Sequence, residues 1–399
     1  MSPRKLPYCP PCQTVRAVQW LWVWLLLGGG AMVVLPGCSG CSGDEQQQTE
    51  KEDEEKEEEE QKKSEQEKQP FEKSLMRVMP YDDRGISPGV KQGHWIAVQQ
   101  AIKANEGDFN GNLQFTPIDR RGAPIDLEDT PFQINLSRPV NLPKDQVKQI
   151  DMTLYAPPTA GNTRLQGGLV SPVGRQAAPA IEEFRSLGAH EYIFAVLANE
   201  SDRYSHLPFM HWSRAPAAHS VQGETYYHIV RPDLDKIVPL SENMLTWTSV
   251  AYVLWDNVDP DLLSMEQQRA LLDWLHFGGQ LIVSGPDSLD SLRGSFLAPY
   301  LPATAGESVD LAADDLAGLS KAFAPKLKSG DVKHLPVAQA WSGVTLQTSE
   351  PTADAEVLFH TADGKPLVVE RRTGRGRVVV TAFRLTESEL VNWPGYDSF

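Results

Sequence analysis

The sequence predicts an α/β domain over residues 190–399, a small β-sandwich-like module over 80–189, and an N-terminal transmembrane or signal segment joined to them by a charged linker. Three observations predict this organisation. They are continuous apolar runs around one well-capped helix, alternating apolar residues before it, and a long uncharged stretch near the N-terminus. A chain of 399 residues can hold two ordinary domains, because single cores rarely exceed about 250 residues.

Residues 17–35 are 19 consecutive positions without a charged side chain, AVQWLWVWLLLGGGAMVVL. About 20 apolar residues are enough for a helix to cross a hydrocarbon core of about 30 Å. Arg4, Lys5 and Arg16 precede the segment and acidic residues follow it. The positive-inside rule therefore predicts a cytoplasmic tail over residues 1–16 and an extracytoplasmic globular part.

The four cysteines all lie within the first 41 residues, at Cys9, Cys12, Cys38 and Cys41. The sequence LPGC, which ends at Cys38, resembles a bacterial lipobox, although its proline is atypical. Three outcomes stay open for this region: an uncleaved anchor, which we favour, lipidation of Cys38, and a cleaved secretory signal. The first two tether the chain to the cell membrane, as a single-pass or a lipid-anchored protein.

We predict no metal site and no cofactor. Cys9 and Cys12 have the C-x-x-C spacing of half a zinc site, but two further ligands are missing, so we favour a chance pair. Five histidines fall within 39 residues at spacings that match no common metal pattern, and we expect them in surface loops. They are His190, His206, His211, His219 and His228.

Residues 36–79 are predicted to be a disordered, charged linker. Residues 44–68 contain 13 acidic side chains and five lysines, a net charge of −8, which is half of the chain's −16. With so few apolar side chains the segment cannot offset the entropy of folding. We favour a self-repelling tether, and the alternative is an acidic tail that binds cations or a basic partner. The acidic balance argues against a nucleic-acid partner, because phosphate binding depends on clustered Lys and Arg.

Residues 80–189 alternate apolar and other side chains over short runs, as strands with one buried face do. The runs are Leu113 and Phe115; Phe132, Ile134 and Leu136; and Ile150, Met152 and Leu154. Pro and Gly between the runs predict turns, and therefore a small antiparallel sandwich. Ile96–Lys103 fits either a short helix or a strand, and Pro179–Arg185 fits a short helix. No catalytic constellation lies here, so we expect binding or spacing.

Residues 190–399 contain continuous apolar runs, which are typical of a parallel sheet covered on both faces by helices. The predicted strands are Tyr192–Leu197, Tyr226–Val230, Val250–Trp255 and Gln280–Ser284. Between the last two strands, Ser264 and Gln267 form a capping box and Gly278-Gly279 end the helix. This part of the sequence predicts a right-handed βαβ unit.

Leu367–Glu370 and Arg377–Phe383 predict a hairpin whose turn contains three arginines. A phosphate or carboxylate site is one interpretation of this turn, but we favour a solvated hairpin tip. Residues 303–350 follow no regular pattern.

Four features of residues 190–395 together resemble the class I glutamine amidotransferase-like, flavodoxin-like domains. They are WDNVDP ending at Pro260, the helix ending in WLHFGG at Gly279, the strand LIVSGP ending at Pro286, and GRGRVVV ending at Val380. Such domains occur in bacterial membrane proteins, often beside β-sandwich modules. The resemblance implies a flavodoxin-like fold for residues 190–399.

The catalytic residues that the resemblance implies are missing. Active members use a cysteine in a sharp strand-to-helix turn, supported by a histidine and a glutamate further along the chain. Here no cysteine follows Cys41, and residues 384–389 after the last strand contain no histidine. Ser284 or Ser288 would be the substitute nucleophile, but neither lies in a G-x-S-x-G elbow. We therefore expect no enzyme activity.

A ligand pocket is predicted at the carboxyl edge of the sheet, where open α/β folds bind ligands. Its candidate residues follow the third and fourth strands and are Asp256, Asp259, Ser284, Asp287 and Ser288. The alternative is that Asp259 starts a turn and Asp256 caps nearby backbone amides.

Together these features predict a noncatalytic, membrane-tethered envelope protein that acts as an interaction or scaffolding module, with the membrane and other envelope proteins as partners. The alternative is a divergent hydrolase or a ligand-binding sensor that uses the carboxyl edge. The aromatic segment Trp393–Phe399 looks as though a helix should follow, so either the natural chain continues or its last element is cut.

Overall fold

The computed structural model describes residues 69–127, 130–214, 224–234, 238–326, 331–348 and 355–399. The predicted tail, the segment at 17–35, Cys38 and most of the predicted linker lie outside these residues. Among the helices described, none is both long and apolar enough to cross a membrane.

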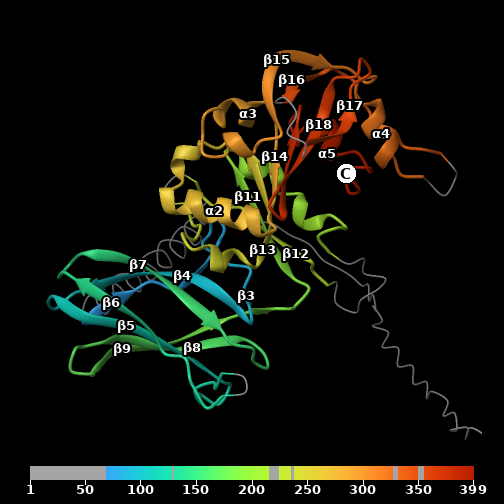
Figure 1. The fold of residues 1–399 in the computed structure, drawn as a ribbon. Helices are drawn as coiled ribbons and strands as arrows, with labels where there is room; N and C mark the ends of the chain where they lie inside the picture. The colour runs from blue at the N-terminus through green and yellow to red at the C-terminus, as the bar shows by residue number, and fades with distance from the viewer. Residues whose placement is uncertain (1–68, 128–129, 215–223, 235–237, 327–330, 349–354) are drawn as a thin grey trace, which may run out of the picture. The chain divides into compact units, whose positions relative to one another are not determined.

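Two four-stranded antiparallel sheets make up the N-terminal half of the described chain (Figure 1). In one sheet β4 pairs with β7 and, on its other side, with β1 and β2; the order of the other sheet is β6-β5-β8-β9. The strands are β1 (Phe71–Lys73), β2 (Arg77–Met79), β4 (His94–Ala104), β5 (Phe109–Ile118), β6 (Leu136–Leu142), β7 (Val147–Ala156), β8 (Thr163–Val170) and β9 (Gln176–Phe184).

Alternating side chains from both sheets fill one shared core. Ile150 and Met152 of β7 and Leu113 and Phe115 of β5 are buried in it. Gly167 of β8 lies so close to β5 that a Cβ would collide with a backbone carbonyl, so only glycine fits there. The period of two in the sequence thus corresponds to one buried face per strand.

Three expectations for this half are wrong. Phe132, Ile134 and Leu136 do not form a strand with one buried face, because β6 begins only at Leu136 and Phe132 is 68% exposed. Pro179–Arg185 is not a helix, because β9 continues to Phe184 as the partner of β8. The linker does not extend to residue 79, because β1 and β2 form there and Met76 and Val78 enter the core. Ile96–Lys103, which fitted either a helix or a strand, lies in β4.

The C-terminal half contains a seven-stranded sheet in the order β12-β11-β13-β14-β19-β18-β17. The first five strands are parallel, and β18 and β17 are antiparallel to their neighbours. The strands are β11 (Tyr192–Ala198), β12 (Tyr227–Val230), β13 (Val250–Asp256), β14 (Gln280–Val283), β17 (Ala355–His360), β18 (Pro366–Thr373) and β19 (Gly376–Thr381). Two-stranded pairs join β3 (Val90–Lys91) to β10 (Ser186–Leu187) and β15 (Ala303–Leu311) to β16 (Trp341–Thr348).

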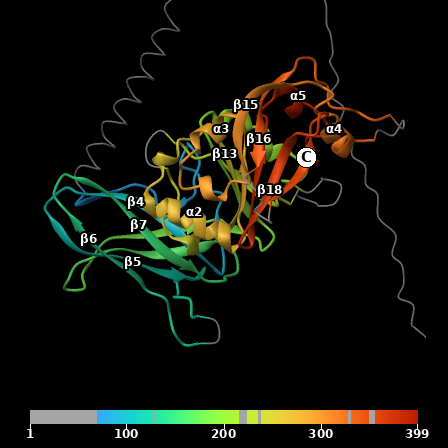
Figure 2. The same ribbon diagram turned by 45° about the horizontal axis from the view of Figure 1, so that its top comes forward.

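The helix α2 (Met265–Phe277) lies against this sheet (Figures 1 and 2). Ser264 and Gln267 form the predicted capping box at its start. The indole N–H of Trp274 donates to the Val250 carbonyl at 2.8 Å, which fixes the helix to β13. The other helices described are shorter: α3 (Asp287–Ser291), α4 (Ala317–Phe323), α5 (Ser388–Val391) and the 3₁₀ turns η1 (Ser201–Tyr204), η2 (Leu207–Phe209), η3 (Met244–Trp247), η4 (Pro260–Leu262) and η5 (Ala298–Tyr300).

The predicted α/β flavodoxin-like fold is wrong, because strands far outnumber helices in the described ranges and they form several sheets. The individual strands and the capped helix form where the sequence predicts them, to within a residue or two. The error lies in the connections. Where helices were expected on both faces, the described connections contain 3₁₀ turns and, over the unassigned residues 303–350, the β15–β16 pair with the short α4.

Candidate functional site

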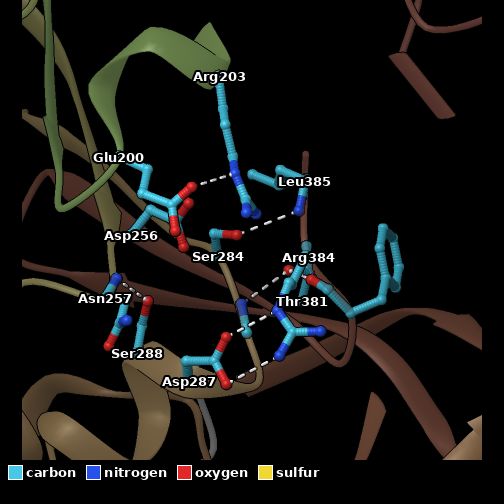
Figure 3. A network of polar contacts seen from close by, with 12 residues as sticks. Glu200, Arg203, Asp256, Asn257, Ser284, Asp287, Ser288, Thr381, Arg384 and Leu385 are labelled. Carbon is cyan, nitrogen blue, oxygen red and sulfur yellow. Dashed lines mark hydrogen bonds and ion pairs between the residues drawn. The ribbon is translucent and has the colours of Figure 1, made fainter. Parts of the chain in front are cut away.

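The carboxyl ends of β11, β13, β14 and β19 bring polar side chains together (Figure 3). A pocket of about 380 Å³, here called the edge pocket, opens among them. It is lined by Glu200, Arg203, Asp287, Arg384, Thr386 and Glu387. Each of these residues follows the end of a parallel strand, so the sheet places them at one edge.

Two ion pairs form part of the lining of the edge pocket. Arg384 donates two hydrogen bonds to Asp287, from Nε at 2.7 Å and from Nη2 at 3.0 Å. Arg203 Nε lies 2.6 Å from the Glu200 carboxylate. The hydrogen bond to Asp287 is the main cause that raises the pKa of Arg384. Burial raises the pKa of Glu387, although the charge of Arg384 opposes it.

Asp256 lies beside Glu200 and Ser284 (Figure 3) and accepts a 2.8 Å hydrogen bond from the buried hydroxyl of Tyr204. Burial raises the pKa of Asp256, and the charge of Asp287 adds to this, while the Tyr204 and Ser284 hydroxyls oppose it. Burial and the neighbouring Asp256 also raise the pKa of Tyr204, so its hydroxyl stays protonated and donates.

Both candidate serines are completely buried and bind backbone. Ser284 Oγ accepts the Leu385 N–H at 3.1 Å, and Ser288 Oγ accepts the Asn257 N–H at 2.8 Å. These bonds hold the chain as it leaves β19 and β13. In the part of the chain that the structure describes, no hydrogen bond joins a histidine to either serine. His206, which follows η1, instead contacts the Arg203 carbonyl and the Tyr396 hydroxyl.

The structure brings four of the five predicted pocket residues together, and one lies apart. Asp256, Ser284, Asp287 and Ser288 all lie in the cluster of Figure 3. Asp259 instead caps the turn η4 and accepts the Asp261 N–H at 3.0 Å, as the alternative interpretation has it. Cys38 lies outside the described residues, so its lipidation stays a prediction.

The prediction missed Glu200, Arg203, Tyr204, Arg384 and Glu387. A signal for them exists, because they follow the first and last parallel strands in the same way as Asp256 follows β13. Open α/β sheets bind ligands at the carboxyl ends of their strands, and the residues that follow β11 and β19 lie at that edge as well. Within the described ranges no group of three or more His, Cys, Asp or Glu is placed to hold a metal ion.

No family model matches this chain, and no curated protein matches it. Solved structures resemble parts of it. They include an exo-β-1,4-mannosidase from Opitutaceae bacterium strain TAV5, at 15% identity over 51% of this chain and 33% of that one, with a TM-score of 0.30. A β-galactosidase from Bacillus circulans sp. alkalophilus is 10% identical over 42% of this chain and 23% of that one, with a TM-score of 0.23.

A Niemann-Pick type C2 protein from the Japanese carpenter ant is 12% identical over 30% of this chain and 92% of that one, with a TM-score of 0.21. The chain thus spans about a third of the mannosidase and less of the galactosidase. Likenesses at these TM-scores carry no argument about fold or function. The resemblance to amidotransferase-like domains is not tested by them and stays a prediction.

Proposed function

We propose that this chain is a noncatalytic interaction module and that the edge pocket is where it contacts a charged partner. The observation that carries this proposal is the division of roles at the carboxyl edge. The oxygens of Ser284 and Ser288 each accept a backbone N–H, and Ser284 also bonds to Asp256, while the charged side chains around them remain partly exposed. Both serine oxygens accept backbone N–H groups, and no histidine among the described residues bonds to either serine, so the arrangement favours binding over hydrolysis.

Partly exposed ion pairs add little to stability but are available to a partner. The side chains of Arg384 and Asp287 are 32% and 41% exposed, and those of Arg203 and Glu200 are 51% and 61% exposed. Pairs of this kind contribute about 0–1 kcal/mol to folding. Because both signs of charge are present, we expect a protein surface that also presents both signs.

The location of this partner is proposed from the sequence alone. The uncharged residues 17–35 and the lipobox-like sequence at Cys38 both favour a chain tethered to a membrane, with partners among envelope proteins. Cell fractionation tests this proposal: the full chain should sediment with membranes, and recovery in the soluble fraction would contradict it.

The test of the edge pocket uses the full chain as bait in detergent-solubilised membranes. The double variant Arg203→Ala with Arg384→Ala should lose the proteins that the wild type captures. Lys365→Ala is the matched control, because Lys365 forms an exposed ion pair with Asp363 outside the edge pocket. Identical capture by both variants would contradict the proposal. Turnover of an amide or ester substrate that Ser288→Ala abolishes would favour the hydrolase alternative instead.

A further inference from the structure

A second pocket, here called the aromatic pocket, lies where β11, β12, β13 and β14 begin, at the edge of the sheet opposite the edge pocket. Its volume is about 470 Å³. Six aromatic side chains line it: Tyr192, Tyr227, Trp247, Tyr252, Trp274 and Phe277. None of the described residues in its lining is charged, although the chain carries a net charge of −16.

The rings of the aromatic pocket are held in place by one another. Tyr227 packs edge-on against Tyr252, with 5.4 Å between ring centres, and Tyr252 stacks on the buried Phe194 at the same separation. Phe277, the last residue of α2, is 70% exposed. Gly279 must be glycine, because a Cβ there would collide with the Trp274 indole. The packed rings therefore make the pocket preformed, and Phe277 adds an exposed ring to its lining.

Most N–H donors around the aromatic pocket are already used. The indole N–H groups of Trp247 and Trp274 donate to backbone carbonyls at 2.9 and 2.8 Å. The N–H groups of Gly278 and Gly279 donate to carbonyls of α2. Lys91 lies over one face of the Tyr192 ring at 3.1 Å and donates to two carbonyls. A ligand would therefore meet ring faces and the hydroxyl pair of Tyr227 and Tyr252, which hydrogen-bond to each other.

We infer that the aromatic pocket binds a neutral oligosaccharide. A sugar ring has an apolar C–H face that packs on an aromatic ring, and a rim of hydroxyls that donate and accept hydrogen bonds as a tyrosine hydroxyl does. It carries no charge, so it enters an uncharged pocket without the cost of desolvating an ion. The volume also lies within the range of about 300–1,000 Å³ that small-molecule sites occupy.

A proline-rich peptide is the competing ligand for an aromatic groove. Such a peptide is held by stacking and by donors that reach its backbone carbonyls. Here both indole donors are already used, whereas the Tyr227 and Tyr252 hydroxyls, which hydrogen-bond to each other, still offer one O–H donor and lone pairs to a sugar. The observations therefore favour the carbohydrate.

The test is isothermal titration calorimetry of the full chain with neutral pentasaccharides of glucose, mannose and N-acetylglucosamine. At least one should bind saturably, and Phe277→Ala should weaken its Kd about tenfold, the equivalent of one lost aromatic contact. Phe209→Ala is the matched control, because Phe209 is 73% exposed and does not line the pocket. It should leave the Kd unchanged.

Three outcomes would overturn the inference: no saturable binding of any neutral pentasaccharide at millimolar concentration, equal binding by Phe277→Ala, or binding of a proline octapeptide that Phe277→Ala removes. Thermal melts of both variants exclude unfolding as the cause, since each replaces an exposed ring. Arg384 lines the edge pocket and not the aromatic pocket. Arg384→Ala should therefore bind the sugar as the wild type does, and a negative result for the sugar would not contradict the proposal for the edge pocket.

Discussion

The hydroxyls of Ser284, Ser288 and Thr381 each take the place of a missing backbone partner near a strand end. Asn257 follows β13 with a φ of 52°, so its N–H turns away from the sheet and needs an acceptor. Ser288 supplies it, and Thr381 does the same for the Gly285 N–H at 3.2 Å. Since a buried N–H without a partner is costly, these hydroxyls act on the backbone and so on the position of the charged side chains nearby.

Ser288→Ala should destabilise the chain by about 1–3 kcal/mol, because the Asn257 N–H loses its acceptor at a buried position. Urea denaturation of the full chain measures this. Ser342→Ala, at an exposed position of β16, is the control and should change stability by less than about 0.5 kcal/mol. Equal stability of the two variants would show that the hydroxyl of Ser288 is free, which would reopen its role as a nucleophile.

Tyr204→Phe should destabilise the chain more at pH 7 than at pH 4. The hydroxyl donates to Asp256, and a hydrogen bond to a carboxylate contributes about 1.5–3 kcal/mol, more than one to a neutral carboxylic acid. Burial raises the pKa of Asp256, so the acid form is reached on moderate acidification. Denaturation curves at both pH values give the difference. A loss that is independent of pH would mean that Asp256 does not ionise in the folded chain.

At the level of elements, local signals predicted the capped helix and the apolar strands but failed at Pro179–Arg185, and the predicted long-range arrangement failed. The capping box of Ser264 and Gln267 and the apolar run of β13 depend on neighbouring residues, and both form as predicted. What covers the sheet depends on contacts between distant segments, and there the flavodoxin-like prediction failed. The edge pocket likewise depends on contacts between distant segments. Arg384 and Asp287 are 97 positions apart, so no local sequence pattern predicts their ion pair.

Ser264→Ala should destabilise α2 and with it the whole C-terminal half. The Ser264 hydroxyl accepts the Gln267 N–H at 3.1 Å, and loss of such a cap costs about 1 kcal/mol. Chemical denaturation detects this change. Ser264→Asp provides the control, because a carboxylate also caps a helix start and should restore most of the stability. If Ser264→Asp is as unstable as Ser264→Ala, Ser264 stabilises the chain by packing and not by capping the helix.

For the molecule as a whole, a polar network joins the two halves of the described chain. Glu191, just before β11, accepts from the Gly188 N–H and lies 3.2 Å from Arg185 and 2.8 Å from His228. The side chains of Glu191 and His228 are only 10% and 12% exposed. The network adjoins the β3–β10 pair, and the chain passes from β10 to β11 of the seven-stranded sheet at this point. Stability at this junction should therefore depend on protonation.

Acidification should weaken the chain in two steps. Burial lowers the pKa of His228 below its ordinary 6.5, although Glu191 opposes this, so the folded state favours the neutral ring and loses stability as pH falls from about 6.5. Burial alone would raise the pKa of Glu191, but the Gly188 N–H, His228 and Arg185 outweigh it and place the pKa below 4.5. The contribution of Glu191 is thus complete above about 4.5 and is lost below that value.

Thermal melts from pH 7.5 to 3.5 separate the two steps. His228→Gln keeps a donor for Glu191 but does not titrate, so it should flatten the first step and leave the second. Burial also lowers the pKa values of His94 and His206, so part of the first step should persist in this variant. The exposed His360→Gln is the control and should keep the wild-type profile. If both variants follow the wild type, protonation of His228 does not control the junction, and the first step belongs to the other histidines.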